Sequence, residues 1–245
     1  MKENTGPQKY RPKQLTIEDI KNGCITLYGE NHDETKLCMI QEEFRQGISL
    51  IQDFTPSVTF YGSARLPEDH IAYKQTHSLA YRIAKELGYN ILSGGGSGIM
   101  EAANKGGFEA GVKSVGLTIR LPHEQITNPY VTNEIPFYFF FARQVAMSYA
   151  TEVVIFCPGG FGTLDELFEM LTLQQTGKLD KIPIILFGSE FWNPIQNLIK
   201  EVLIDKYKTI SPADLDLYTI TDDEDLILKI ISESRMRDGK DSLTQ

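Results

Sequence analysis

Short apolar runs alternate with amphipathic stretches along most of the chain. The runs are rich in β-branched and aromatic residues, as in buried strands, and they are Val58–Tyr61, Asn90–Leu92, Val115–Ile119, Ile135–Phe141, Val153–Phe156, Ile182–Phe187 and Tyr218–Ile220. Apolar residues spaced three or four apart predict the intervening helices, which are Tyr73–Leu87, Ile99–Ala110, a short helix through Arg143, one around Leu164–Leu171, one from Pro194 and a final helix. This alternation predicts an α/β fold with a mostly parallel sheet flanked by helices on both faces.

Composition and spacing divide the chain into four segments. Residues 1–14 are polar and are expected to form a flexible tail, followed by a helical extension at 15–52. Within the extension, apolar residues at every third or fourth position predict an amphipathic helix, and they are Leu37, Ile40, Phe44, Ile48 and Ile51. The main α/β domain is expected over 53–231, and a polar, mobile tail over 232–245.

A glycine-rich turn, Pro158–Glu166, separates a predicted strand from a predicted helix. Glycine lets the backbone approach an anion without obstruction by a side chain. The start of the following helix supplies free N–H groups and the positive end of the helix dipole. The turn therefore predicts a phosphate site, with the carboxylate of Glu166 beside it in the first turn of the helix.

The same residues also allow a purely structural interpretation. Thr163 and Glu166 have the spacing of a capping box, which needs only hydrogen bonds at the start of a helix. Thr221–Glu224 repeats this spacing without a glycine turn before it, and we interpret that second box as structural. The three glycines ahead of Glu166 favour a functional role for its carboxylate.

A second glycine turn, Gly94–Gly98, follows another predicted strand. Two such turns in one parallel sheet should meet at the carboxyl ends of the strands and hold a ligand at two points. Neither turn completes the G-x-G-x-x-G pattern, which disfavours a Rossmann dinucleotide site. Leu179 follows Gly177-Lys178, so there is no phosphate-binding loop of the kinase type.

Two arginines are candidates for the same cleft. Gly62–Arg65 ends the first predicted strand, so Ser63 and Arg65 could reach the ligand, although Arg65 could equally be a solvated surface cation. Arg143 follows a strongly aromatic segment, where a guanidinium should be partly buried and require an anion. That anion is either Glu166 or a ligand phosphate.

Charge and composition exclude several classes of protein. The 245 residues carry a formal net charge of -9, which argues against a nucleic-acid polymer as partner. No apolar run approaches the roughly 18 residues of a membrane span, and the N-terminus has no apolar signal core. The four histidines lack metal-ligand spacing, so no metal is expected. No G-x-S-x-G motif occurs, which leaves α/β-hydrolase chemistry unsupported.

The three cysteines, Cys24, Cys38 and Cys157, form no C-x-x-C pair and are odd in number. This usage fits a reducing compartment, so a cytoplasmic location is expected. Cys157 directly precedes the Pro-Gly-Gly turn and could act as a nucleophile. A buried strand cysteine with a structural role is the favoured interpretation.

Two motifs make the chain resemble a known family. Ser93–Asn104 and Pro158–Glu166 are similar to the paired signatures of the Lonely Guy family of nucleoside 5′-monophosphate phosphoribohydrolases, many of which were formerly labelled possible lysine decarboxylases. The resemblance spans about 58–192 and takes in Gly62–Arg65 and Leu121–Tyr130. It implies a Rossmann-like three-layer fold, a homodimer or larger homo-oligomer, and cleavage of the N-glycosidic bond to give a base and ribose 5-phosphate.

The resemblance also implies the residues of the site. Arg143 and Glu166 would be catalytic, and the substrate would be a nucleotide such as AMP or a cytokinin-type monophosphate, with no cofactor. The residues expected to bind it are Gly62, Ser63, Arg65, Gly95, Gly96, Met147, Gly159, Gly160, Gly162 and Thr163. Family members usually carry lysine where this chain has Gln144, and often proline where it has Ser97, so substrate preference or rate could differ.

Two other functions remain as alternatives. A nucleotide-binding regulatory or carrier protein, like the molybdenum-cofactor carriers, would share the sheet and the glycine turns, but binding alone does not require Glu166 beside a phosphate. A lysine decarboxylase would need a lysine that forms a Schiff base with pyridoxal phosphate. Lys105 and Lys178 lie near the glycine motifs, but the residues around them do not mark either one as a Schiff-base lysine.

Overall fold

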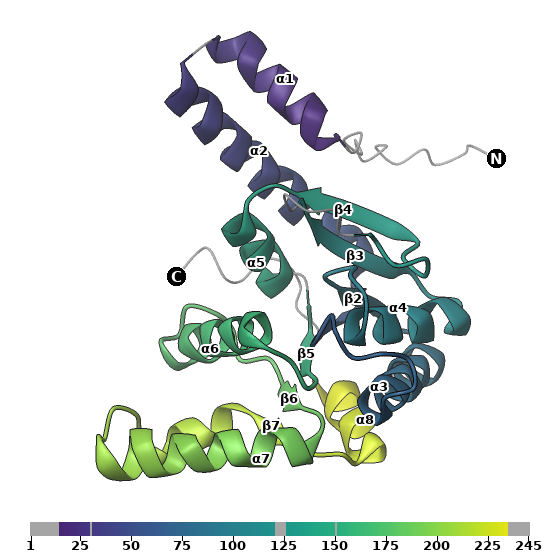
Figure 1. Ribbon diagram of the computed structural model, residues 1–245, viewed down its shortest axis with the longest axis vertical. Helices are drawn as coiled ribbons and strands as arrows, with labels where there is room; N and C mark the ends of the chain where they lie inside the picture. Colours follow the sequence, from purple (N-terminus) through teal and green to yellow (C-terminus); the bar gives the residue numbers. More distant parts are fainter. Residues whose placement is uncertain (1–14, 30, 121–125, 150, 235–245) are drawn as a thin grey trace, which may run out of the picture.

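The computed structural model describes residues 15–29, 31–120, 126–149 and 151–234 (Figure 1). Its centre is a seven-stranded sheet in the order β4-β3-β2-β1-β5-β6-β7, in which every strand pair is parallel. The strands are β1 Ser57–Tyr61, β2 Asn90–Ser93, β3 Ser114–Ile119, β4 Asn133–Phe137, β5 Val153–Phe156, β6 Ile184–Leu186 and β7 Thr219–Ile220. The strand order reverses between β1 and β5, and ligands bind at such a point in open α/β sheets.

Helices cover both faces of this sheet and bury its side chains in two separate cores. Along β5, Val154 and Phe156 belong to the core beneath α5 and α6, whereas Val153 and Ile155 belong to the core beneath α3 and α4. The described helices are α1 Ile17–Tyr28, α2 His32–Ile51, α3 Ile71–Arg82, α4 Ile99–Ala110, α5 Phe140–Tyr149, α6 Phe161–Gln175, α7 Ser189–Leu198 and α8 Glu224–Glu233. The fold is thus the Rossmann-like three-layer α/β arrangement that the sequence predicts.

Two helix starts differ from the sequence prediction because distant carboxylates determine them. Phe140 and Phe141 begin α5 rather than ending a strand, and Glu43 accepts the N–H groups just before that helix. Helix α7 begins before Pro194, where Asp222 accepts the N–H groups of Gly188 and Ser189. The contacts that start these helices come from residues far away in the sequence, so the local apolar pattern does not show them.

The other boundaries lie within a few residues of their predicted places. The predicted helix over Tyr73–Leu87 is α3 continued by a π-helical segment, Ile83–Leu87, and Gly88 ends it with a φ of 73°. The predicted polar tail begins too early, since α8 continues to Glu233. Residues 1–14 and 235–245, expected as tails, lie outside the described residues.

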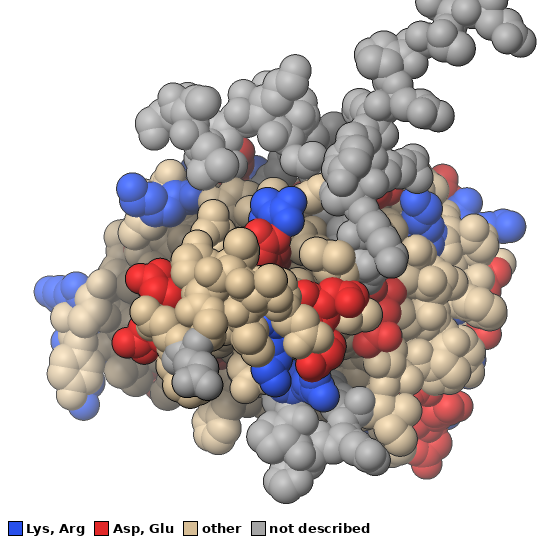
Figure 2. All heavy atoms as spheres, turned by 90° about the horizontal axis from the view of Figure 1, so that it is seen from above, with Lys and Arg blue, Asp and Glu red and all other residues tan. Residues whose placement is uncertain are grey.

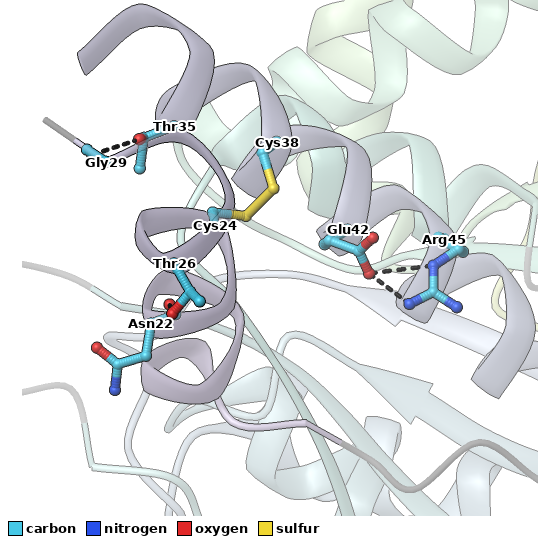
Figure 3. The surroundings of a disulfide bond; sticks show 8 residues. All are labelled: Asn22, Cys24, Thr26, Gly29, Thr35, Cys38, Glu42 and Arg45. Atoms are coloured by element: carbon cyan, nitrogen blue, oxygen red, sulfur yellow. Dashed lines mark hydrogen bonds and ion pairs between the residues drawn. A yellow bond between two sulfur atoms is a disulfide. The ribbon is translucent and has the colours of Figure 1, made fainter. Parts of the chain in front are cut away.

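Helices α1 and α2 form a hairpin at the N-terminal end of the chain (Figure 1). The predicted apolar stripe lies on α2. Helix α1 precedes the stripe, which does not predict it. Cys24 on α1 and Cys38 on α2 form a disulfide with a Cα–Cα distance of 5.8 Å (Figure 3). Because these two cysteines are paired, cysteine usage does not support the reducing compartment that the sequence predicted.

Charged side chains of both signs lie on the surface. Acidic and basic side chains are interspersed over the described part of the face in Figure 2, and basic residues do not form a continuous band there. None of the described helices is long and apolar enough to cross a membrane.

Candidate functional site

Loops that follow β1, β2 and β5 meet at the carboxyl edge of the sheet. The N–H of Ser63, after β1, donates to the carbonyl of Pro158, after β5, at 3.0 Å. The carbonyl of Ser63 accepts from the N–H of Ile99, at the start of α4, at 2.9 Å. The hydroxyl of Ser97 donates to the carbonyl of Ala64 at 2.7 Å. The two glycine turns and the loop of Gly62–Arg65 therefore form one connected framework, as the sequence analysis expects.

Glycine is required where these loops approach one another. A Cβ on Gly62 would overlap the side chain of Ile99, and a Cβ on Gly98 would overlap the carbonyl of Ser63. Gly98 also has a φ of 66°, in the left-handed region that favours glycine. These two positions explain part of the glycine pattern by packing, independently of any ligand.

A buried polar cluster, which the sequence analysis missed, fixes the turn after β2. The side-chain amide of Asn128 donates to the carbonyl of Gly96 at 2.9 Å, and its main-chain N–H donates to that of Gly95 at 2.9 Å. Asn104, fully buried on α4, accepts from Asn128 and from the hydroxyl of Ser93. An asparagine on the apolar face of a helix was the available sign of this cluster, because a buried amide needs polar partners.

The turn after β5 leaves the start of α6 open. Gly160 precedes the helix as its N-cap and, having no side chain, provides no side-chain hydrogen bond there. A Cβ on Gly159 would overlap the side chain of Thr163, whereas Gly160 and Gly162 face open space. The first N–H groups of α6 thus keep the positive end of the helix accessible, as an anion site requires.

The capping-box interpretation of this turn was wrong. Because α6 begins at Phe161, Thr163 lies inside the first turn and Glu166 lies beyond it. The comparison box at Thr221–Glu224 was also wrong, since Asp223 is the N-cap of α8. Glu224 instead pairs with a distant arginine. Spacing alone did not locate the helix starts.

Arg143 and Glu166 form a nearly buried ion pair next to this turn. The guanidinium nitrogen Nη2 of Arg143 donates to Oε1 of Glu166 at 3.1 Å, and the two side chains are only 11% and 15% exposed. Arg143 also lies against the other glycine turn, since a Cβ on Gly94 would be 3.2 Å from its Nη1. Its Nε is buried without a hydrogen-bond partner among the described residues. The sequence left open whether a carboxylate or a phosphate balances Arg143, and in this structure it is Glu166.

Burial raises the pKa of Glu166 to about 7. Arg143 acts in the opposite direction, and the carboxylates of Asp165 and Glu169 raise the pKa further. Tyr61, at the end of β1, is buried close by, and its pKa is raised by burial and then by the charge of Glu166. A carboxyl group with a pKa near neutrality can exchange protons at ordinary pH, which is the property of a general acid or base.

The remaining predicted residues lie around this pair at different depths. Ser63 accepts the N–H of Arg65 at 3.0 Å through its hydroxyl, while the side chain of Arg65 is exposed. Met147 is buried in the core one helical turn after Arg143. Gln144, where the family resemblance implies a lysine, donates to Asp165 at 2.8 Å. A neutral amide thus replaces a cation on the exposed side of the pair.

Other candidate chemistries find less support in the described residues. Burial raises the pKa of Cys157 to about 12, and Thr76 donates to its sulfur at 3.3 Å, so this thiol has a structural environment. Lys105 lies over the ring of Tyr130 at 5.4 Å and Lys178 is exposed beyond the end of α6. No group of three or more metal-ligating side chains forms within the described part of the chain.

Comparison with known proteins identifies the family. Residues 100–231 match the family described as possible lysine decarboxylase. The chain belongs to this family. It is the Lonely Guy family that the two glycine motifs resemble, and the matched residues include both Arg143 and Glu166.

One curated relative and two solved structures illustrate the similarity. A cytokinin riboside 5′-monophosphate phosphoribohydrolase from Rhodococcoides fascians is 28% identical over 91 residues, which cover 37% of this chain and 42% of the relative. The molybdenum cofactor binding protein of Rippkaea orientalis has a TM-score of 0.52 and 21% identity, covering 72% of this chain and 93% of that one. The molybdenum cofactor carrier protein of Chlamydomonas reinhardtii has a TM-score of 0.53 and 22% identity, with coverages of 73% and 96%. These structures share the fold.

Proposed function

We propose that this protein hydrolyses the N-glycosidic bond of purine nucleoside 5′-monophosphates, AMP or cytokinin-type nucleotides, to the free base and ribose 5-phosphate. The observation that carries the proposal is the buried Arg143–Glu166 pair at the open N-terminus of α6. A phosphate site and an ionisable carboxyl group at the same edge match a substrate with a phosphate at one end and a glycosidic bond nearby. The similarity to the phosphoribohydrolase of Rhodococcoides fascians supports this substrate class.

The phosphate would bind at the turn of Gly159–Thr163. No side chain caps the start of α6, Gly160 and Gly162 face open space, and the helix dipole favours a negative charge there. Binding energy from this group, remote from the reacting bond, would hold the ribose over Glu166. Gly62, Ser63, Gly95 and Gly96, on the two neighbouring loops, would contact the rest of the nucleotide.

Glu166 would act on the glycosidic bond. The bond between C1′ and the base nitrogen breaks with its electron pair going to the base, which takes up a proton from solvent, and positive charge develops on the ribose. The carboxylate of Glu166 stabilises that charge, accepts a proton from the water whose oxygen adds to C1′, and then releases that proton to solvent. Arg143 holds the carboxylate in place through its 3.1 Å contact. No cofactor takes part in this scheme.

Incubation with a panel of nucleoside 5′-monophosphates and the matching nucleosides tests the proposal. Chromatography would measure free base, and a coupled assay would measure ribose 5-phosphate. We expect both products in equal amounts from purine monophosphates and scarcely any from the nucleosides. Equal turnover of adenosine and AMP would contradict the phosphate anchor, and no turnover of any monophosphate would contradict the reaction.

A carrier protein is the second candidate, because the solved structures with this fold include a molybdenum cofactor carrier and a molybdenum cofactor binding protein. A carrier would bind its cofactor without chemical change and would not depend on the charge of Glu166. Mass spectrometry of ligand recovered after incubation separates the two functions. A lysine decarboxylase is disfavoured, since Lys105 stacks on Tyr130 and Lys178 is exposed.

We propose a homodimer or larger homo-oligomer. Large apolar side chains are exposed near the site on α5 and α6, and they are Phe140, Phe141, Phe161 and Phe168. Association of two copies would remove such a surface from water. Light scattering at micromolar concentration measures the mass, and a monomer would contradict this assembly.

A further inference from the structure

A carboxylate from the N-terminal hairpin sits at the beginning of the arginine-bearing helix. Glu43 lies on α2 and is only 2% exposed. Its Oε1 accepts the N–H of Tyr138 at 2.9 Å, and its Oε2 accepts the N–H of Phe139 at 3.1 Å. These two residues immediately precede α5, so Glu43 satisfies N–H groups at the entrance of the helix and places a carboxylate at its positive end.

The packing of α2 on α5 is close enough to fix this geometry. A Cβ on Gly47 would lie 2.9 Å from the ring of Phe137 and 3.2 Å from the Cβ of Ala146, which leaves no room for a side chain between the helices. One turn away, the rings of Phe44 and Phe141 lie 6.1 Å apart, within contact range for an aromatic pair. Movement of α2 would therefore be transmitted to α5.

A short chain of contacts connects Glu43 to the ion pair. Phe139, whose N–H donates to Glu43, accepts the main-chain N–H of Arg143 through its carbonyl at 3.2 Å. The guanidinium of Arg143 then donates to Glu166. Arg143 lies in the first turn of α5, so the placement of that turn determines where its guanidinium reaches.

We propose that Glu43 is a positioning residue for the reaction. It fixes the first turn of α5 and thereby the contact of Arg143 with Glu166. This role gives the N-terminal hairpin a function in the site, although α1 and α2 precede every strand of the sheet. The expected effect of Glu43 on catalysis rests on the proposed function. The expected effect of Glu43 on the contact between Arg143 and Glu166 does not.

Glu43→Gln is the test variant and Glu152→Gln is its matched control. Glutamine keeps the size of the side chain but replaces one accepting oxygen with an NH2 group. Because NH2 is a donor, it cannot accept the hydrogen bond of the backbone N–H that faces it. Glu152 is also a buried carboxylate that accepts a backbone N–H, that of Ser57, at the opposite end of β1 and β5. Both variants lose a contact between a buried carboxylate and the backbone, but the contact of Glu43 lies just before α5 and that of Glu152 lies at the start of β1. Thermal melting of both variants measures the shared effect on stability.

The decisive readout is the titration of Glu166, followed by carbon NMR of labelled glutamate carboxyl groups and assigned with Glu166→Gln. The charged or titratable groups that act on Glu166 are Arg143 from α5, Asp165 and Glu169 from α6, and Tyr61 from β1. In Glu43→Gln the only one expected to move is Arg143, whose cation lowers the pKa of Glu166. We therefore expect that pKa to rise in Glu43→Gln and to stay at its wild-type value in Glu152→Gln.

Kinetics provide the second readout. Displacement of a catalytic group lowers kcat. For AMP, kcat should therefore fall about tenfold or more in Glu43→Gln and remain near the wild-type value in Glu152→Gln. An unchanged Glu166 pKa in folded Glu43→Gln would overturn the proposal. If that variant does not fold, Glu43→Asp, which keeps the charge on a shorter side chain, takes its place with the same expectations. If no monophosphate is hydrolysed, the proposed function fails, while the titration still decides the role of Glu43.

Discussion

The side chains of Arg143 and Glu166 meet at 3.1 Å although their helices follow strands at different places in the sheet. Helix α5 follows β4, the edge strand, and α6 follows β5, which lies beside β1 in the middle. The pair thus joins helices from the two halves of the sheet at the point where the strand order reverses. Burial of both side chains makes the pair electrostatically strong and gives the carboxyl group its raised pKa.

The pH dependence of turnover should report the titration of Glu166. If the reaction needs the carboxylate, kcat should rise as pH increases through about 7 and level off above it, because the group is protonated below its pKa. Arg143→Gln removes the cation that lowers this pKa, so the rise should move to higher pH, with lower kcat at every pH. Initial rates at saturating AMP from pH 5 to 9 measure both effects.

The substrate phosphate also titrates, with a pKa of about 6, and could be mistaken for Glu166. Its titration should not move in Arg143→Gln if it is remote from that residue. A profile that is flat between pH 6 and 8, or a midpoint unaffected by Arg143→Gln, would show that Glu166 does not control the rate.

Gly160 should matter for binding and not for folding. Its position faces open space, so Gly160→Ala should fold normally while its methyl group hinders the approach of a phosphate. We expect KM for AMP to rise about tenfold, close to 1.4 kcal/mol of binding free energy. Gly23→Ala, also in open space but on α1, is the matched control and should leave KM unchanged. Equal KM values in the two variants would place the phosphate elsewhere.

The disulfide should be detectable by counting thiols. Unfolded protein prepared without reductant should show one reactive thiol, Cys157, and reduced protein should show three. Cys24→Ser removes the cross-link between α1 and α2, and in the chain-entropy model the cost for a loop of this length is about 3 kcal/mol. Three thiols without reductant, in protein purified under air, would mean that the bond does not form.

The sequence predicted most of the fold because the strands are buried on both faces and the helices have clear apolar stripes. It also predicted the two glycine turns and the meeting of their loops, since parallel strands end at one edge. What it missed depends on contacts between distant residues. Glu43 starts α5 from 95 positions away, Asn128 holds the turn at Gly96, and Asp222 starts α7. Local spacing carries no information about such partners. The predicted capping boxes failed for a different reason, because the adjacent residues Gly160 and Asp223 are the N-caps of α6 and α8.

AMP hydrolysis by Glu166→Gln measures whether cleavage requires the charge of Glu166. Asp165→Asn, a change of the same kind at the adjacent exposed carboxylate, is the control. At pH 8, wild type and Asp165→Asn should release adenine and ribose 5-phosphate at similar rates, and Glu166→Gln should be about a hundredfold slower or more. Near-normal hydrolysis by a well-folded Glu166→Gln protein would show that cleavage does not need this charge.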